Sequence, residues 1–482
     1  MSGFAPAPRE GTEPPRLREE ALPGDSRDSL AGLPARARLA GLTADALSRA
    51  GRTGTVVAML LVDVDDFKEV NDARGHAAGD ELLSEFGRRL GRLAGGRGAV
   101  VRVSGDEFAM LAGDFAGRDE VAIFADRIVD AFAAPFALSG GSVFASASVG
   151  VATSEDGGGA DELLRHAGLA LHAAKSSGGR RWRRYAPALG AAMDERHRVR
   201  SALEREVRGS GVPGQAACGP AVPGRVAPGC SFALAYQPIV ALGSGLIVGF
   251  EALLRWRHRT LGLLMPGQFI KIAEETGLIV PIGAWVIGRA LRDLAAGGPY
   301  PGAARPYVSV NVSARQLRSP GFAGSVREAL ALSGLPSSAL VLELTESALI
   351  PKEGVAAREL AELAGLGVRL AIDDFGTGYS SLSYLHELPI DILKIDRSFV
   401  AGPAVSRRRL AIVQGVISIA RNLQIEVVAE GIETADQREM LAATGCEFGQ
   451  GYLLAKPMKW AQAQHLLRAG RAPSSARPPR PQ

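Results

Sequence analysis

The second half of the chain contains eight short apolar segments, and amphipathic stretches separate most of them. Segments of this length and composition are typical of β-strands, and the stretches between them repeat apolar residues at helical spacing. The strands are expected at residues 233–239, 247–253, 308–311, 340–344, 369–373, 392–395, 426–429 and 448–452. Eight strands in roughly 240 residues have the size and rhythm of a TIM-like (β/α)8 barrel, so an α/β barrel is predicted here.

Polar and charged residues stand at the ends of most of these strands. They are Glu251, Asn311, Glu343, Asp373, Asp374, Lys394 and Glu430, with Glu346 three residues after Glu343. In a (β/α)8 barrel the carboxyl ends of the strands meet on one face, where barrel enzymes carry their active sites. We therefore expect these side chains to converge on one site.

The residue types in this ring predict the ligand that it takes. They offer carboxylate and amide oxygens but neither Cys nor His, which suits Mg²⁺ or Mn²⁺ and argues against zinc. So many carboxylates would repel one another without metal, and they suffice for two cations that promote the attack of water on a phosphodiester. Lys394 would pair with the carboxylates, orient that water or assist its deprotonation. A single acid at a strand end is more often a helix cap or an Arg partner, but this series of them favours a site.

The first half has a different order of elements. Strands are expected at residues 55–62, 100–103, 108–111 and 144–151, and helices at 82–93, 118–133 and 160–175. The order strand, helix, hairpin, helix, strand is typical of an α+β ferredoxin-like sheet. Asp63 follows the first strand, and Asp106 and Glu107 lie in the hairpin turn. If these strands are neighbours, Asp63 and Glu107 can share a cation with a nucleoside triphosphate, although spacing alone favours a solvated turn.

Three segments have compositions that do not build a core. Residues 1–27 and 469–482 are expected to be disordered tails, and residues 209–230 hold six Gly and four Pro, which indicates a linker. The first domain is placed at 28–185, a helical segment with the linker at 186–231, and the second domain at 232–468. Because residues 1–27 are few and polar, no sensory domain is expected before Asp28.

Charge and cysteine content exclude several classes of protein. The net charge is +4, and the Arg residues of the Pro-rich ends lack interleaved aromatics, so no nucleic-acid partner is expected. No segment has the length and apolar character of a membrane span, and the N-terminus lacks a secretory signal. The three cysteines lack the spacing of a disulfide framework or a metal site, which suits a reduced cytoplasm.

Seven motifs of the second half occur in order. They are Glu251-Ala-Leu-Leu-Arg-Trp256, Asn311-Val-Ser, Glu343-Leu-Thr-Glu346, Asp373-Asp-Phe-Gly-Thr-Gly-Tyr-Ser-Ser-Leu382, Lys394-Ile-Asp396, Glu430-Gly-Ile-Glu433 and Gln450-Gly-Tyr452. With these motifs, residues 232–468 resemble the EAL domain, a (β/α)8 phosphodiesterase that linearises cyclic di-GMP to pGpG with Mg²⁺ or Mn²⁺.

The resemblance implies a role for each matched position. The implied metal ligands are Glu251, Asn311, Glu343, Asp373, Asp374 and Glu430. Lys394 and Gln450 would place the water, and Glu346 would hold the loop over residues 373–382. Gln237 and Arg255 would contact the dinucleotide. None of these positions departs from the family pattern.

Three motifs of the first half resemble the GGDEF domain, over about residues 28–185. They are Asp63-Val-Asp-Asp-Phe-Lys-Glu-Val-Asn71-Asp, Gly75-His76-Ala-Ala-Gly79-Asp80 and Arg102-Val-Ser104-Gly-Asp-Glu-Phe108. Members of that family condense two GTP into cyclic di-GMP across a homodimer. The resemblance implies Mg²⁺ with GTP at Asp63 and Glu107, and activation of the 3′-hydroxyl by Asp106. It also implies guanine contacts at Asn71 and Asp80 and a phosphate contact at Lys175.

This half also departs from the family pattern. Ser104 replaces the first Gly of the signature, and Gly95 and Gly98 replace the Arg and Asp of an inhibitory product site. After Lys175 the sequence Ser-Ser-Gly-Gly-Arg180 replaces the usual Arg and Asn, and the following Arg residues either substitute for that Arg or form a solvated basic run. The first half is therefore expected either to synthesise cyclic di-GMP or to bind GTP and regulate the hydrolase.

A different class of function is the alternative for the whole chain. A non-catalytic sensor of cyclic di-GMP or GTP would act through protein partners. Such domains usually lose a metal-binding acid or the lysine, and this chain retains Glu251, Asp373, Asp374, Lys394 and Glu430. The hydrolase is therefore the favoured hypothesis.

Overall fold

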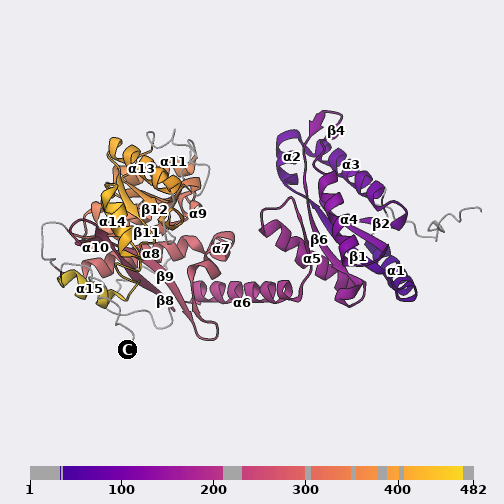
Figure 1. Cartoon of the computed structure of the whole chain (residues 1–482), viewed down its shortest axis with the longest axis horizontal. Coiled ribbons are helices and arrows are strands. Elements are labelled where there is room, and N and C mark those ends of the chain that lie inside the picture. The colour runs from indigo at the N-terminus through magenta and orange to yellow at the C-terminus, as the bar shows by residue number, and fades with distance from the viewer. Residues whose placement is uncertain are drawn as a thin grey trace, which may run out of the picture. The chain divides into compact units, whose positions relative to one another are not determined.

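The computed structural model describes residues 33, 36–209, 231–298, 305–348, 354–376, 388–400 and 407–469. They form two compact units, and the division falls between Arg196 and His197, inside α6 (Pro187–Gly209). Figure 1 draws both units with their helices and strands labelled. The expected tails lie outside the described residues except for residue 469, and so does the expected linker except for Gly209.

The N-terminal unit is a five-stranded sheet in the order β2-β3-β1-β6-β7, covered by helices. Its strands are β1 (Val56–Val64), β2 (Gly98–Ser104), β3 (Glu107–Phe115), β6 (Ala147–Thr153) and β7 (Trp182–Arg184), and β4 (Phe136–Leu138) and β5 (Gly141–Val143) form a separate hairpin. Its helices are α1 (Leu39–Thr53), α2 (Phe67–Arg74), α3 (His76–Ala94), α4 (Arg118–Ala131) and α5 (Ala160–Ser176). Strand β1 is antiparallel to β3 and β6, so the predicted ferredoxin-like order is confirmed.

The central strand β1 is buried on both faces because its side chains alternate. One set, which includes Met59, packs with Leu39 of α1 and Leu163 of α5. The other set, which includes Leu60, packs with Phe86 of α3 and residues of α4. Two helical layers thus hold the strand end that carries the acidic residues.

Several predicted bounds in this unit were wrong. Strand β1 runs to Val64, so Asp63 lies inside the strand rather than after it. Strand β6 begins at Ala147 instead of residue 144, and Phe144 is 77% exposed. Helix α2, the first residues of α3, the β4–β5 hairpin and β7 were not expected, since they are short or weakly apolar.

The C-terminal unit contains a closed barrel of eight strands in the order β9-β11-β12-β13-β14-β15-β16-β8, with β8 paired back to β9. These are β8 (Phe232–Ala241), β9 (Ile247–His258), β11 (Tyr307–Val312), β12 (Leu340–Thr345), β13 (Arg369–Phe375), β14 (Ile392–Ile395), β15 (Glu426–Ala429) and β16 (Phe448–Gly449), and β10 (Gly262–Leu264) extends β9 as a hairpin. The predicted TIM-like barrel is confirmed. Strand β16 is shorter than the predicted 448–452 segment.

The barrel is not uniformly parallel. Strand β8 is antiparallel to both of its neighbours, β9 and β16. The connection from Ala241 to Ile247 is a tight turn, whereas a parallel connection needs a crossover of a dozen or more residues. Reversal of the first strand brings the start of β8 to the same face as the carboxyl ends of the other strands.

Helices pack outside the barrel and share one apolar core with it. They are α7 (Pro266–Thr276), α8 (Ile279–Ala295), α9 (Ala314–Leu317), α10 (Phe322–Ser333), α11 (Val355–Gly365), α12 (Arg397–Val400), α13 (Arg407–Asn422), α14 (Ala435–Ala443) and α15 (Trp460–Ala469). Val199 and Leu203 of α6, four residues apart, join the same core. The end of α6 is therefore part of the barrel unit.

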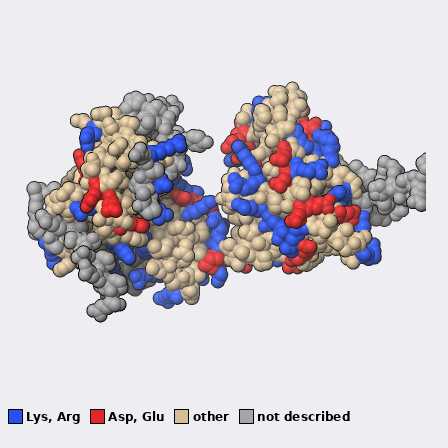
Figure 2. Space-filling view, viewed as in Figure 1, with Lys and Arg blue, Asp and Glu red and all other residues tan. Residues whose placement is uncertain are grey.

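The described surface carries charges of both signs. Figure 2 shows Lys and Arg interspersed with Asp and Glu on the visible face of each unit, in keeping with the net charge of +4. Among the helices of the described residues, none combines the length and the apolar character needed to cross a membrane.

Candidate functional site

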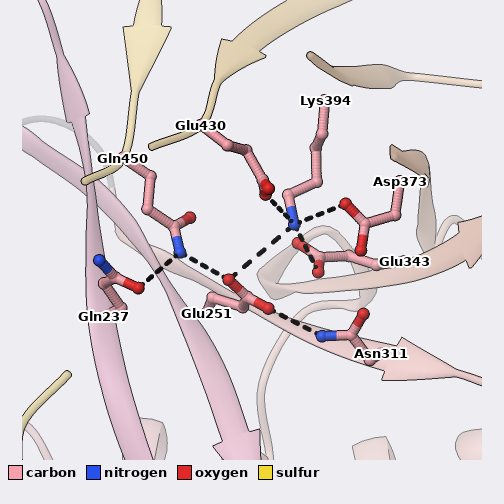
Figure 3. A network of polar contacts seen from close by, with 8 residues as sticks. All are labelled: Gln237, Glu251, Asn311, Glu343, Asp373, Lys394, Glu430 and Gln450. Atoms are coloured by element: carbon pink, nitrogen blue, oxygen red, sulfur yellow. Dashed lines mark hydrogen bonds and ion pairs between the residues drawn. The ribbon is translucent and has the colours of Figure 1, made fainter. Parts of the chain in front are cut away.

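A ring of polar side chains from the barrel strands forms one network of contacts (Figure 3). Each comes from a different strand, or from the residue directly after one: Gln237 (β8), Glu251 (β9), Asn311 (β11), Glu343 (β12), Asp373 (β13), Lys394 (β14), Glu430 (after β15) and Gln450 (after β16). Strand alternation directs every second side chain into a barrel. The strand-end residues expected from the sequence therefore do converge.

Lys394 lies at the centre of this ring and is 2% exposed. Its Nζ is 2.6 Å from Glu430 Oε1, 2.9 Å from Glu343 Oε2 and 3.1 Å from Asp373 Oδ1. Glu251 Oε2 is more distant, at 3.9 Å. The contact with Asp373 has ion-pair distance without hydrogen-bond geometry. One ammonium thus connects four carboxylates from four strands.

The ring has more negative charge than Lys394 can balance. Glu251, Glu343, Asp373 and Glu430 surround one ammonium, and Asp374 lies beside Asp373 and Glu430. These five carboxylates leave an excess of four charges when all are ionised. Burial raises the pKa of Glu430 to about 7 in spite of its ion pair with Lys394. Burial also raises the pKa of Glu343 well above its usual range. Burial alone would lower the pKa of Lys394, but the surrounding carboxylates outweigh it and hold that pKa high.

These residues fit a site for divalent cations. Asp373, Asp374 and Glu430 each place a carboxylate oxygen within 4.8 Å of the others, close enough to share an ion. The excess of four negative charges equals the charge of two divalent cations. Oxygen donors without nitrogen or sulfur match hard cations such as Mg²⁺ and Mn²⁺ rather than zinc.

A bulge in β13 lets adjacent Asp373 and Asp374 face one site. The register against β14 shifts between Ile372 and Phe375. Asp374 has a φ of 53°, in the left-handed region that non-glycine residues rarely adopt. In a regular strand, neighbouring side chains point to opposite faces. Bulges re-aim side chains near active sites, and this one explains how both carboxylates reach the cluster.

Amide side chains continue the ring on the opposite side. Gln450 Nε2 donates to Glu251 Oε2 at 2.5 Å and to Gln237 Oε1 at 3.0 Å. Asn311 Nδ2 donates to Glu251 Oε1 at 2.8 Å. Both oxygens of Glu251 therefore accept a hydrogen bond, which fixes the orientation of this carboxylate.

Two other predicted residues lie beside the ring. Arg255 follows Glu251 by four residues in β9; burial lowers the pKa of its guanidinium, and Glu251 counteracts this. Glu346 begins a short turn (Glu346–Ala348) directly after β12. Its expected partner loop lies mostly outside the described residues, which resume only at residue 388.

A second acidic site lies at the end of β1 in the N-terminal unit. Asp63 pairs directly across the strands with Glu107, as the sequence predicted if the strands were neighbours. Lys175 Nζ lies 2.6 Å from Asp63 Oδ1. Burial raises the pKa of Asp63 to about 6, although Lys175 opposes the shift. Asp106 lies in the adjoining turn and accepts a backbone hydrogen bond from Val64 at its carbonyl.

Asn71 and Asp80 lie on neighbouring helices of this unit. Asn71 is on α2 and Asp80 on α3, and Gly79 passes so close to Asn71 that a Cβ there would lie 2.0 Å from Asn71 Oδ1. That oxygen is buried and has no hydrogen-bond partner among the described residues. A side chain at position 79 would therefore displace the Asn71 amide.

Sequence reasoning missed Asp65 as a site residue. Its carboxylate accepts hydrogen bonds from Ser148 Oγ at 2.6 Å, Ser146 Oγ at 2.9 Å and the Arg180 backbone N–H at 3.1 Å. It thereby fixes the turn that follows Lys175. Asp65 is the first residue after β1, and no local pattern indicates these contacts, because they come from β6 and from the turn near Arg180.

Comparison with known proteins agrees with this organisation. Residues 227–457 match the family model of the EAL domain, and residues 25–181 match that of the diguanylate cyclase, GGDEF domain. The chain is 38% identical to cyclic di-GMP phosphodiesterase NbdA of Pseudomonas aeruginosa, over 92% of this chain and 54% of the relative. It is 37% identical to bifunctional diguanylate cyclase/cyclic di-GMP phosphodiesterase MucR of the same organism, over 94% and 62%. A solved structure, the PaMucR phosphodiesterase in complex with c-di-GMP, is 40% identical over 56% of this chain and 99% of that chain, with a TM-score of 0.47.

Fold, site and family matches together define a two-domain chain, with a cyclase-type α+β domain followed by a barrel whose strand ends carry an acidic site. The chain belongs to the family of tandem GGDEF–EAL proteins. The resemblance predicted from the motifs is confirmed. The chain spans about half the length of the curated relatives it matches, at 54%, 50% and 50% for three of them.

Proposed function

We propose that the barrel hydrolyses cyclic di-GMP to pGpG with Mg²⁺ or Mn²⁺. The observation that carries this proposal is the cluster of five carboxylates, four of them around Lys394, with an excess negative charge that two divalent cations would balance. Glu251, Asn311, Glu343, Asp373, Asp374 and Glu430 would hold the cations. Once bound, these would lower the pKa of a water and withdraw charge from the phosphate oxygens.

The chain's own side chains would position the reacting groups. Lys394 stays an ammonium because the carboxylates hold its pKa high, so it would donate hydrogen bonds to the attacking water and orient it rather than accept its proton. Gln450 would hold Glu251, and through it the edge of the site, in place. Attack on one phosphorus breaks the bond to the 3′-oxygen, which receives a proton, and the phosphate stays on the 5′-oxygen of linear pGpG.

The remaining matched residues would bind the dinucleotide or order the site. Gln237 and Arg255 lie beside the acidic ring and are proposed to contact the substrate. Glu346 would hold the loop after β13. Domain limits of 28–185 and 232–468, with 186–231 as the connection between them, remain part of this proposal.

For the N-terminal unit we propose Mg²⁺-dependent binding of GTP at Asp63 and Glu107. The direct pairing of these two carboxylates supports it, and Lys175 is near enough to move from Asp63 to a phosphate. Asn71 and Asp80 would contact guanine, and Asp106 would assist the 3′-hydroxyl if two such sites meet in a homodimer. Bound GTP would serve either synthesis or regulation of the hydrolase.

The test is incubation of the full chain with cyclic di-GMP and Mg²⁺, with and without GTP, and quantification of pGpG by chromatography. Rapid pGpG formation is expected, and a change in rate with GTP would assign the N-terminal unit a regulatory role. Glu251→Gln should abolish turnover, whereas the matched change at exposed Glu447 should not. Binding of cyclic di-GMP without any pGpG would favour a non-catalytic sensor.

A further inference from the structure

Tyr452 is a largely exposed aromatic residue close to the acidic ring. Its side chain is 59% exposed, and among the described aromatic residues only Phe144, in the other unit, is comparably exposed. It follows Gln450 by two residues. An exposed aromatic ring removes little apolar area from water, so it contributes little hydrophobic stabilisation. Packing within the fold therefore does not explain an aromatic residue at position 452.

Hydrogen bonds fix the segment that carries Tyr452 to the barrel. Gln237, which binds Gln450, also donates from Nε2 to the Ala455 carbonyl at 3.2 Å. Tyr236 and Met458 exchange two backbone hydrogen bonds of 2.7 and 3.0 Å. The Leu453 N–H donates to the Ile432 carbonyl at 3.0 Å. Tyr452 is thus held on a short, well-anchored segment at the rim of the site.

A positively charged side chain lies close to the aromatic ring of Tyr452. Lys456 Nζ lies 5.5 Å from the centroid of the Tyr452 ring, within the range of a cation–π contact. Arg255 comes from β9, four residues after Glu251 and on the same face of the strand. The rim therefore combines an aromatic face with two cations, directly beside a cluster that is strongly acidic.

That combination matches the chemistry of a nucleotide. A purine base has a flat π-face that stacks on aromatic side chains. The phosphates of the nucleotide would be repelled by the acidic ring unless nearby cations compensated for its charge. Lys456 and Arg255 offer such compensation.

We propose that Tyr452 is the stacking platform for one purine base of the substrate, and that Lys456 holds the ring in place and attracts the adjacent phosphate. This rests on the proposed function, because it names how that site recognises its dinucleotide. It makes Tyr452 and Lys456 determinants of affinity rather than of the chemical step.

The first experiment is equilibrium binding of cyclic di-GMP to the full chain, with Ca²⁺ in place of Mg²⁺ and with chromatography to verify that the ligand stays intact. Tyr452→Ala should weaken binding by roughly ten-fold or more, since a base–aromatic stack is worth that much. Tyr452→Phe should stay within about two-fold of the unsubstituted chain. Tyr452→Leu, which keeps apolar bulk without a π-face, should resemble Tyr452→Ala. Phe144→Ala is the matched control for loss of an exposed aromatic and should change nothing.

A second pair of variants tests the cation. Lys456→Ala should weaken binding less than Tyr452→Ala, and its effect should shrink as salt is raised. Lys459→Ala, at an exposed lysine on the next stretch of chain, should have no effect. Equal losses for both lysines would overturn the role of Lys456.

A second substrate, bis(p-nitrophenyl) phosphate, is a phosphodiester without a purine. Its turnover distinguishes loss of base recognition from damage to the structure of the site. Tyr452→Ala should raise KM for cyclic di-GMP and leave turnover of this probe unchanged. Unchanged cyclic di-GMP affinity in Tyr452→Ala, or equal losses on both substrates, would overturn the inference. Binding that depends on Tyr452 in a chain that makes no pGpG would refute the proposed hydrolase and keep the inference. Absence of binding in the unsubstituted chain would refute both.

Discussion

At the scale of single residues, Lys394 combines a structural role with its proposed role in the reaction. It is the one cation inside the ring among the described side chains, and it forms ion pairs with four carboxylates. Removing one partner of a buried ionic network leaves the others uncompensated, at a cost of roughly 3–5 kcal/mol. The residue therefore contributes to the stability of the site as well as to the proposed orientation of water.

Lys394→Met is expected to lower the stability of the barrel in EDTA and to abolish pGpG formation. Mg²⁺ should recover much of the stability, since cations would replace the missing ammonium, but should not recover turnover. Denaturant unfolding with and without Mg²⁺ measures the first effect, and the pGpG assay the second. Equal unfolding midpoints of the variant and the unsubstituted chain in EDTA would contradict the role of Lys394 as internal counter-charge.

We expect metal binding to depend on pH near neutrality through Glu430. Its pKa of about 7 means that the carboxyl group holds a proton below that value, and a cation must displace this proton. Affinity for Mg²⁺ should therefore rise as pH increases from about 6 to about 8, as calorimetric titration would show. Glu430→Gln should weaken binding at every pH and flatten the dependence; a dependence that persists in that variant would assign it to another group.

The raised pKa of Glu430 has the opposite effect on the stability of the metal-free chain, which should fall as pH rises. Because the folded-state pKa of Glu430 lies above the usual 4.5 of glutamate, the folded chain retains a proton that the unfolded chain has lost. Its contribution to stability is full below the unfolded pKa and is lost as pH rises through about 7. Metal would remove that loss by stabilising the carboxylate.

At the scale of elements, the bulge in β13 decides whether the two adjacent carboxylates act together. Asp374 adopts a φ of 53°, which Asn tolerates and a β-branched residue does not. We expect Asp374→Asn to fold normally and to lose Mg²⁺ affinity, while Asp374→Val should also lose roughly 1–2 kcal/mol of stability. Unfolding and metal titration of both variants test this; equal stabilities would show that the bulge is not strained.

The turn after α5 offers a parallel case in the N-terminal unit. Asp65 accepts three hydrogen bonds that connect β1, β6 and the turn containing Arg180. Asp65→Ala should weaken GTP binding by releasing this turn and should cost roughly 1–3 kcal/mol of stability. Exposed Asp72→Ala is the control and should leave both unchanged. GTP affinity that survives Asp65→Ala would mean that the turn takes no part in the nucleotide site.

At the scale of the whole molecule, the chain carries two acidic sites in two units that each have their own core. Asp63→Asn should abolish GTP binding and any effect of GTP on pGpG formation, while the basal rate without GTP stays unchanged. Measuring basal and GTP-dependent rates on the same preparation tests this. A fall in the basal rate would show that Asp63 supports the barrel as well as its own nucleotide site.

Local pattern was enough to predict much of this molecule. Short apolar segments and the order of elements predicted the barrel and the ferredoxin-like sheet, because strand and helix formation depends largely on residues close in sequence. The positions of Asn311, Glu343, Lys394 and Glu430 at or near strand ends followed from the same pattern, whereas Glu251 lies within β9, which is longer than predicted. The motifs added the family.

Contacts between segments that are distant in sequence were decided by the tertiary structure alone. Closure of the barrel brings Gln237 and Gln450 within hydrogen-bond distance although they are 213 residues apart. The reversed first strand, the bulge that aims Asp373 and Asp374 together, and the clamp of Asp65 on the turn near Arg180 have no local signature. Periodicity is set by each strand's own backbone, whereas register, bulges and closure depend on which strands pair, and that is determined by packing across the whole unit.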